Sequence, residues 1–154
     1  MSTEFKIEGL DEVTRKLQAL GSQKVAKRIA RKASRQAMNL VRDAARINAK
    51  AIDDPETAEK IFKNIVTQGG KSRNANEVVM RVGVRGGASQ NKHSVSTAGL
   101  SGGDTRHWRY KEYPTSKTVA TPFMRPALAN NIQQVTNKFV QVFDTELGKE
   151  LAKL

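Results

Sequence analysis

The strongest constraint on the fold is a set of apolar residues that recurs every three or four positions between residues 24 and 51. This spacing is typical of an amphipathic α-helix with one stripe facing a core. Neither glycine nor proline interrupts the segment, so the sequence predicts one long helix. The stripe consists of Val25, Ile29, Ala33, Ala37, Leu40, Ala44, Ile47 and Ala51.

The same segment holds most of the excess positive charge. The 154-residue chain has a net charge of +12, and this segment combines nine basic side chains with one carboxylate, Asp43, for a local net charge of +8. At about 100° per residue, the basic side chains fall in an arc opposite the apolar stripe. Such a face favours contact with phosphate groups or an acidic protein surface, and the alternative is an ordinary solvated face. The nine residues are Lys24, Lys27, Arg28, Arg31, Lys32, Arg35, Arg42, Arg46 and Lys50.

Three further elements are predicted in the first half of the chain. Residues 4–8 alternate like a half-buried strand, and residues 11–20 carry Val13, Leu17 and Leu20 at helical spacing. A second helix is expected to start at Asp54-Pro55 and to end at Gly69-Gly70.

The second half of the chain predicts two strands and a helix. Residues 77–85 alternate between apolar and partly basic positions, and residues 107–113 are interpreted as a strand that pairs with them. An apolar seam from Leu128 to Leu151 predicts a final helix that starts near Pro126. The expected fold is a single α+β domain over residues 1–154, in which a small antiparallel sheet packs against the long basic helix and the C-terminal helix.

A Gly/Ser/Thr-rich segment, residues 86–106, separates the two expected strands and would form the tip of a long hairpin. Its composition offers little apolar surface to offset the entropy of ordering. Val95 and Leu100 are its only sizeable apolar residues, and we expect them to anchor the loop against a neighbouring subunit.

The composition argues against catalysis and against bound metals or cofactors. The chain has no cysteine and two histidines, too few for a zinc site built from standard ligands. Ser94, His93 and Asp104 occur together, but a catalytic triad needs a rigid scaffold, which a Gly/Ser-rich loop does not provide. No apolar run reaches the roughly 20 residues that span a bilayer, so no membrane partner is expected. The aromatic residues near Trp108 are assigned to the core in preference to base stacking.

A rigid corner is predicted before the final helix. Pro122 and Pro126 restrict their own backbone and that of the residue before each of them, including Arg125, to a narrow range. Phe123 is expected to be buried in the core, with Pro126 at the first position of the helix.

The residues around this corner carry a resemblance to a known family. The sequence Ala-Thr-Pro-Phe-Met-Arg-Pro-Ala-Leu (120–128), together with FKIEGLDEVTRKLQAL at 5–20, resembles the tail-completion or head-tail joining proteins of long-tailed bacteriophages. That family is related to the minor tail protein Z of lambda-like phages. The similarity extends over nearly the whole chain in the same order.

The resemblance implies a structural role without enzymatic activity. The protein would complete the phage tail and join it to the neck as a ring around the DNA channel, located in the virion and, during assembly, in the host cytoplasm. Its partners would be further copies of itself, tail-terminator or tail-tube proteins, head-side connector proteins and the genomic DNA. From the basic helix alone, the alternative is a stand-alone protein that binds nucleic acid without sequence preference.

Overall fold

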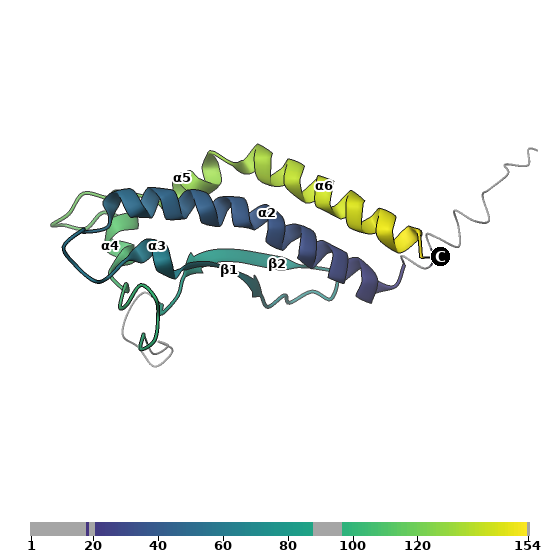
Figure 1. The fold of residues 1–154 in the computed structure, drawn as a ribbon, viewed down its shortest axis with the longest axis horizontal. Helices are drawn as coiled ribbons and strands as arrows, with labels where there is room; N and C mark the ends of the chain where they lie inside the picture. The colour runs from purple at the N-terminus through teal and green to yellow at the C-terminus, as the bar shows by residue number, and fades with distance from the viewer. Residues whose placement is uncertain (1–17, 19–20, 88–96, 154) are drawn as a thin grey trace, which may run out of the picture.

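The computed structural model describes residue 18, residues 21–87 and residues 97–153 (Figure 1). The predicted strand at residues 4–8 lies outside the described residues, as does all but Gln18 of the predicted helix at residues 11–20. The described elements are α2 (Gln23–Ile52), α3 (Ile61–Asn64), β1 (Ile65–Gly70), β2 (Val79–Val84), α4 (Trp108–Glu112), α5 (Met124–Ala129) and α6 (Ile132–Leu151).

The predicted α+β class is confirmed. The 30-residue helix α2 is the central element, with the β1–β2 sheet on one side and the 20-residue helix α6 along the other (Figure 1). Arg28 near the start of α2 pairs with Glu150 near the end of α6, so the two helices are antiparallel. Helices α3 and α5 also pack against α2, which explains why the apolar stripe of this helix dominates the sequence.

The buried stripe of α2 differs from the predicted one in its second half. The buried residues are spaced four apart, and each step of four advances about 40° around a helix of 3.6 residues per turn. The stripe therefore winds from the side facing α6 toward the side facing α3 and α5. The predicted position of Ile47 is wrong, because its side chain is 72% exposed. The buried residues are Ile29, Ala33, Ala37, Val41, Ala45 and Ala49.

The predicted helix at residues 54–68 is wrong. Only α3, a four-residue helix, forms there, and the chain becomes strand β1 at Ile65. Ile65, Val66 and Thr67 are all β-branched, which favours an extended backbone once a neighbouring strand is present. That neighbour is β2, which confirms the predicted strand at residues 77–85 and pairs antiparallel with β1, with Ile65 opposite Val84.

The predicted strand at residues 107–113 is also wrong, because the segment forms helix α4. Residues 86–106 are therefore not the tip of a hairpin between two paired strands. Trp108 and Glu112 are four residues apart and both point inward, whereas Tyr110 is exposed. This i, i+4 relation is helical, and the apparent alternation of aromatic and charged residues concealed it.

The C-terminal helix is divided into α5 and α6 by Asn130-Asn131. The core lies where α5 meets the second half of α2, and Trp108 contacts the ring of Phe123 edge-on at 6.4 Å between centroids. The expected burial of Phe123 is confirmed. The buried cluster at this junction comprises Val41, Ala45, Ala49, Ile61, Ile65, Phe123 and Ala127.

Candidate functional site

The nine basic residues of α2 do not form one uniform surface, because the fold gives them different neighbours. Two lie against α6: Lys32 Nζ is 2.8 Å from Glu146 Oε1, and Arg28 pairs with Glu150. The hydrogen bond from Lys32 lowers the pKa of Glu146, and the pKa of Glu150 is lowered first by Lys153 and then by Arg28. Arg28 and Lys32 therefore have carboxylate partners within the protein.

Three more of the nine have neighbours near the C-terminal end of α2. Arg46 donates from Nε (3.0 Å) and Nη2 (2.7 Å) to the carbonyl oxygen of Ile65, which attaches β1 to the helix. Arg42 pairs with Asp43 at 2.8 Å, and Lys50 Nζ lies 5.8 Å from the ring centroid of Phe62. Arg46 is thus primarily a structural residue.

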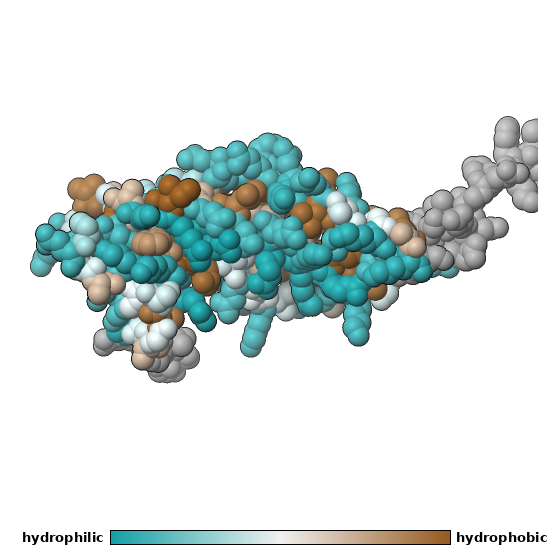
Figure 2. Space-filling model, viewed as in Figure 1, coloured by the Kyte–Doolittle hydropathy of each residue, from teal (hydrophilic) through white to brown (hydrophobic). Residues whose placement is uncertain are grey.

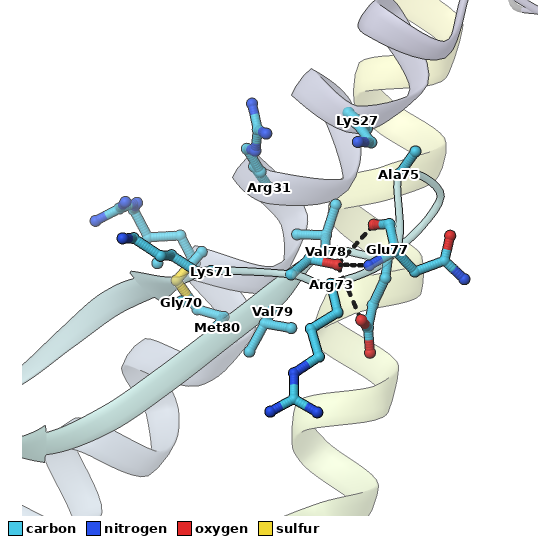
Figure 3. A pocket seen from close by; sticks show the side chains of 14 residues that line it. Lys27, Arg31, Gly70, Lys71, Arg73, Ala75, Glu77, Val78, Val79 and Met80 are labelled. Carbon is cyan, nitrogen blue, oxygen red and sulfur yellow. Dashed lines mark hydrogen bonds between the residues drawn. The ribbon is translucent and has the colours of Figure 1, made fainter.

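A cleft beside the first half of α2 brings three of the other four basic residues together with two that were not predicted from the sequence. It has a volume of about 430 Å³ and lies between α2 and the segment that connects β1 to β2. In Figure 3, Lys27 and Arg31 lie on the helix side of this cleft, and Lys71 and Arg73 lie on the strand and loop side. The basic residues that line it are Lys27, Arg31, Arg35, Lys71 and Arg73. We call this site the basic cleft.

One carboxylate, Glu77, also lines the basic cleft, and the hairpin loop already engages it. The hydroxyl of Ser72 lies 2.9 Å from Glu77 Oε2 and 2.6 Å from the carbonyl oxygen of Asn74, and it accepts the Asn74 N–H at 3.1 Å (Figure 3). These contacts fix the turn after β1 that carries Lys71 and Arg73. The local excess of cations suits an anionic ligand, such as a phosphate chain.

Lys71 and Arg73 had a weak signal in the sequence. They flank Ser72 directly after Gly69-Gly70, the predicted end of a helix. The distance between this run and α2 depends on the β1–β2 pairing, which the sequence analysis did not identify. Lys24, the remaining predicted residue, is exposed near the start of α2.

The predicted corner at residues 122–126 is organised by Glu112, a residue that the sequence analysis did not single out. Its Oε2 accepts the backbone N–H groups of Phe123 and Met124, both at 2.9 Å, and its Oε1 accepts the N–H and the Nε–H of Arg125 at 2.9 and 3.0 Å. The carboxylate thereby caps the N-terminus of α5 from a separate helix. Pro126 lies in the first turn of α5, two residues later than predicted, because the helix begins at Met124.

Burial alone would raise the pKa of Glu112, but the hydrogen bonds from Met124, Phe123 and Arg125 outweigh it and leave the pKa below its usual value. Glu112 is 1% exposed, and its charge is held by three backbone donors and one guanidinium. On the outer side, Arg125 also stacks over the ring of Tyr113, 4.8 Å from its centroid. The corner is therefore a site of structural fixation.

The described part of the Gly/Ser-rich segment packs on α3. Asn64, which is buried, donates to the carbonyl of Gly103 (2.9 Å) and to Thr105 Oγ1 (2.7 Å), and its Oδ1 accepts the N–H of Gly102 (2.9 Å). A Cβ at Gly102 would lie 2.2 Å from the carbonyl oxygen of Lys60, so only glycine fits there. Hydrogen bonds, and not apolar surface, therefore hold residues 102–105 against α3.

Of the two predicted anchors of that segment, the structure describes only Leu100. Leu100 is half-buried, and its side chain lies close to Gly86 within the same chain. Val95 lies outside the described residues. The role of Leu100 as an anchor to a neighbouring subunit stays a prediction.

No protein-family model matches the chain, and no curated protein or solved structure is significantly similar to it. Among the described helices, none is long and apolar enough to cross a membrane. Within the described ranges, no three side chains of the kinds that bind metals gather in one place. The chemistry of the basic cleft is thus the main basis for a functional proposal.

Proposed function

We propose that this protein is a structural subunit of a bacteriophage virion that completes the tail and joins it to the neck, as a ring around the DNA channel. The observation that carries the proposal is the basic cleft, where five cations from α2 and the β1–β2 loop face one already engaged carboxylate. A channel lining needs charge that contacts DNA without reading its sequence, and basic side chains directed at phosphates provide this. The resemblance of residues 5–20 and 120–128 supports the same role.

The neighbours of each basic side chain indicate which of them are available to contact DNA. Arg31 and Arg35 are exposed and line the basic cleft, whereas Arg28 and Lys32 lie on the same helix but pair with Glu150 and Glu146. Removing a cation that already has a carboxylate partner should cost less DNA affinity than removing one that faces the cleft. The two pairs therefore form a matched comparison.

We expect Arg31→Gln with Arg35→Gln to weaken binding to duplex DNA of any sequence. The slope of log affinity against log salt should become shallower by about 1.8, because each lost phosphate contact removes about 0.9. Arg28→Gln with Lys32→Gln should change the slope much less. Fluorescence anisotropy with two unrelated duplexes between low and moderate salt measures both quantities, and equal slope changes in the two variants would remove the cleft from the DNA contact.

The assembly part of the proposal is tested separately by mass. Native mass spectrometry of the protein, alone and with the neighbouring tail proteins, should reveal a closed oligomer. A protein that binds DNA but remains monomeric under every condition would support the alternative, a stand-alone nucleic-acid-binding protein. A ring that does not bind DNA would retain the assembly role and identify the cleft as a site for an acidic protein surface.

A further inference from the structure

Two apolar hollows follow one another along the face of α2 that lies between β2 and α6. The first, about 230 Å³, is lined by Ala26 and Ala30 of α2, by Val78 and by Phe143 of α6. The second, about 300 Å³, is lined by Ala37 of α2, Met80 of β2 and Phe139 of α6. We call the two together the apolar groove. Small residues on α2 form its floor, and large residues of the neighbouring elements form its walls.

The apolar groove begins where the N-terminal part of the chain joins α2. Gln23, the first residue of α2, lines the first hollow. Just before it, the N–H of Gly21 donates to the carbonyl of Gln18 at 3.1 Å, and Ser22 has an extended backbone (φ −61°, ψ 107°). The helix therefore does not continue straight through Ser22, and a turn this short is compatible with a helical hairpin.

We infer that residues 4–20 of the same chain occupy the apolar groove. Val13, Leu17 and Leu20 have the i, i+4, i+7 spacing of a helix with one apolar side, which matches a groove floored by alanines. Phe5 and Ile7 alternate with charged residues, as a strand placed along β2 would. This assignment does not depend on the proposed function.

The length of the segment agrees with this occupant. From Ala26 to Met38 the floor extends about 18 Å at 1.5 Å per residue, and a nine-residue helix of about 13 Å followed by extended chain covers that distance.

The absence of cysteine from the chain makes a clean test possible. Ala26→Cys places a single thiol in the groove, and Ala51→Cys, also an exposed alanine of α2 but outside the groove, is the control. In the full-length protein the thiol at position 26 should react with a maleimide at least about tenfold more slowly than the thiol at position 51. The reason is that a covered thiol reacts only when the covering segment opens. Adding Leu17→Asp and Leu20→Asp should remove this protection and leave the rate at position 51 unchanged.

A cross-link identifies the occupant directly. Val13→Cys with Ala30→Cys should form a disulfide at monomer mass under mild oxidation, because a hairpin that turns at residues 21–22 places position 13 opposite position 30. Val13→Cys with the exposed Arg31→Cys should not, because a disulfide tolerates only short Cα separations. Equal thiol rates at positions 26 and 51, or no cross-link, would overturn the inference. A cross-link found only at dimer mass would assign the groove to a second copy of the chain and overturn the same-chain assignment.

Discussion

At the scale of single residues, Glu112 shows how one carboxylate can replace a local helix cap. Helix α5 has no side-chain cap of its own at Phe123, and Glu112 satisfies three of its free N–H groups from eleven to thirteen residues away. Arg125 completes the arrangement by donating to the carboxylate and to the carbonyl of Glu112. One buried carboxylate therefore fixes the start of α5.

Replacing Glu112 with Gln should lower the free energy of unfolding by about 2–3 kcal/mol, because the amide nitrogen cannot accept the donors that one carboxylate oxygen accepts. The folded-state pKa of Glu112 is lowered, so its stabilisation is complete above the unfolded pKa of about 4.3 and is lost as the pH falls through the folded pKa. Thermal or urea unfolding from pH 7 to pH 2.5 checks both effects. The variant should lose this component of the acid dependence, and an identical pH profile would contradict the role of the charge.

At the scale of elements, the pieces that the sequence predicts correctly carry their own periodicity. Helix α2, strand β2 and the main part of α6 each show an apolar repeat that survives in the structure, even where the stripe of α2 winds away from Ile47. The short elements were not predicted correctly, because contacts with residues distant in the sequence stabilise them. Asp53 at the end of α2 accepts the N–H groups of Ile61 and Phe62 and so starts α3, a contact that local pattern does not encode.

The candidate site follows the same division. The basic residues of α2 are evident in the sequence. That Arg28 has a carboxylate partner whereas Arg31 lines the cleft depends on where α6 places Glu150. Lys71 and Arg73 join the cleft only through the pairing of β1 with β2. Sequence therefore identifies the charge, whereas tertiary contacts determine which cations remain available to a ligand.

Gly102→Ala should separate residues 102–105 from α3. The added methyl would meet the carbonyl of Lys60 at 2.2 Å, and backbone cannot yield as a flexible side chain does, so we expect a loss of about 2–4 kcal/mol. Gly69→Ala in β1 is the control, because nothing lies within 4 Å of its Cβ position. Urea unfolding compares the two, and equal stabilities would show that the segment does not need this close approach.

At the scale of the whole molecule, two apolar residues of the C-terminal seam lie at the surface. Figure 2 shows hydrophilic residues over most of one face, with apolar residues in separate patches. At the corner between α5 and α6, Leu128 and Ile132 are 47% and 59% exposed although both belong to the apolar seam. If the proposed ring forms, these two side chains are candidates for its subunit interface.

Leu128→Gln with Ile132→Gln should therefore prevent self-association and leave the fold intact. Because both side chains are exposed, the free energy of unfolding should change by no more than about 0.5 kcal/mol each. Val140→Gln, a half-exposed position further along α6, is the control and should still assemble. Sedimentation velocity over a range of concentrations reads the outcome, and an unchanged oligomer in the double variant would place the interface elsewhere.

The hydrogen bonds of Glu112 and Asn64 also imply an order of folding. Glu112 reaches Phe123 across 11 residues, whereas Asn64 reaches Gly102 across 38, and the longer closure costs about 1 kcal/mol more in chain entropy. We expect the corner to be formed in the transition state and the contact of residues 102–105 with α3 to form afterwards. Substitutions at Glu112 should then slow folding, and substitutions at Gly102 should mainly accelerate unfolding.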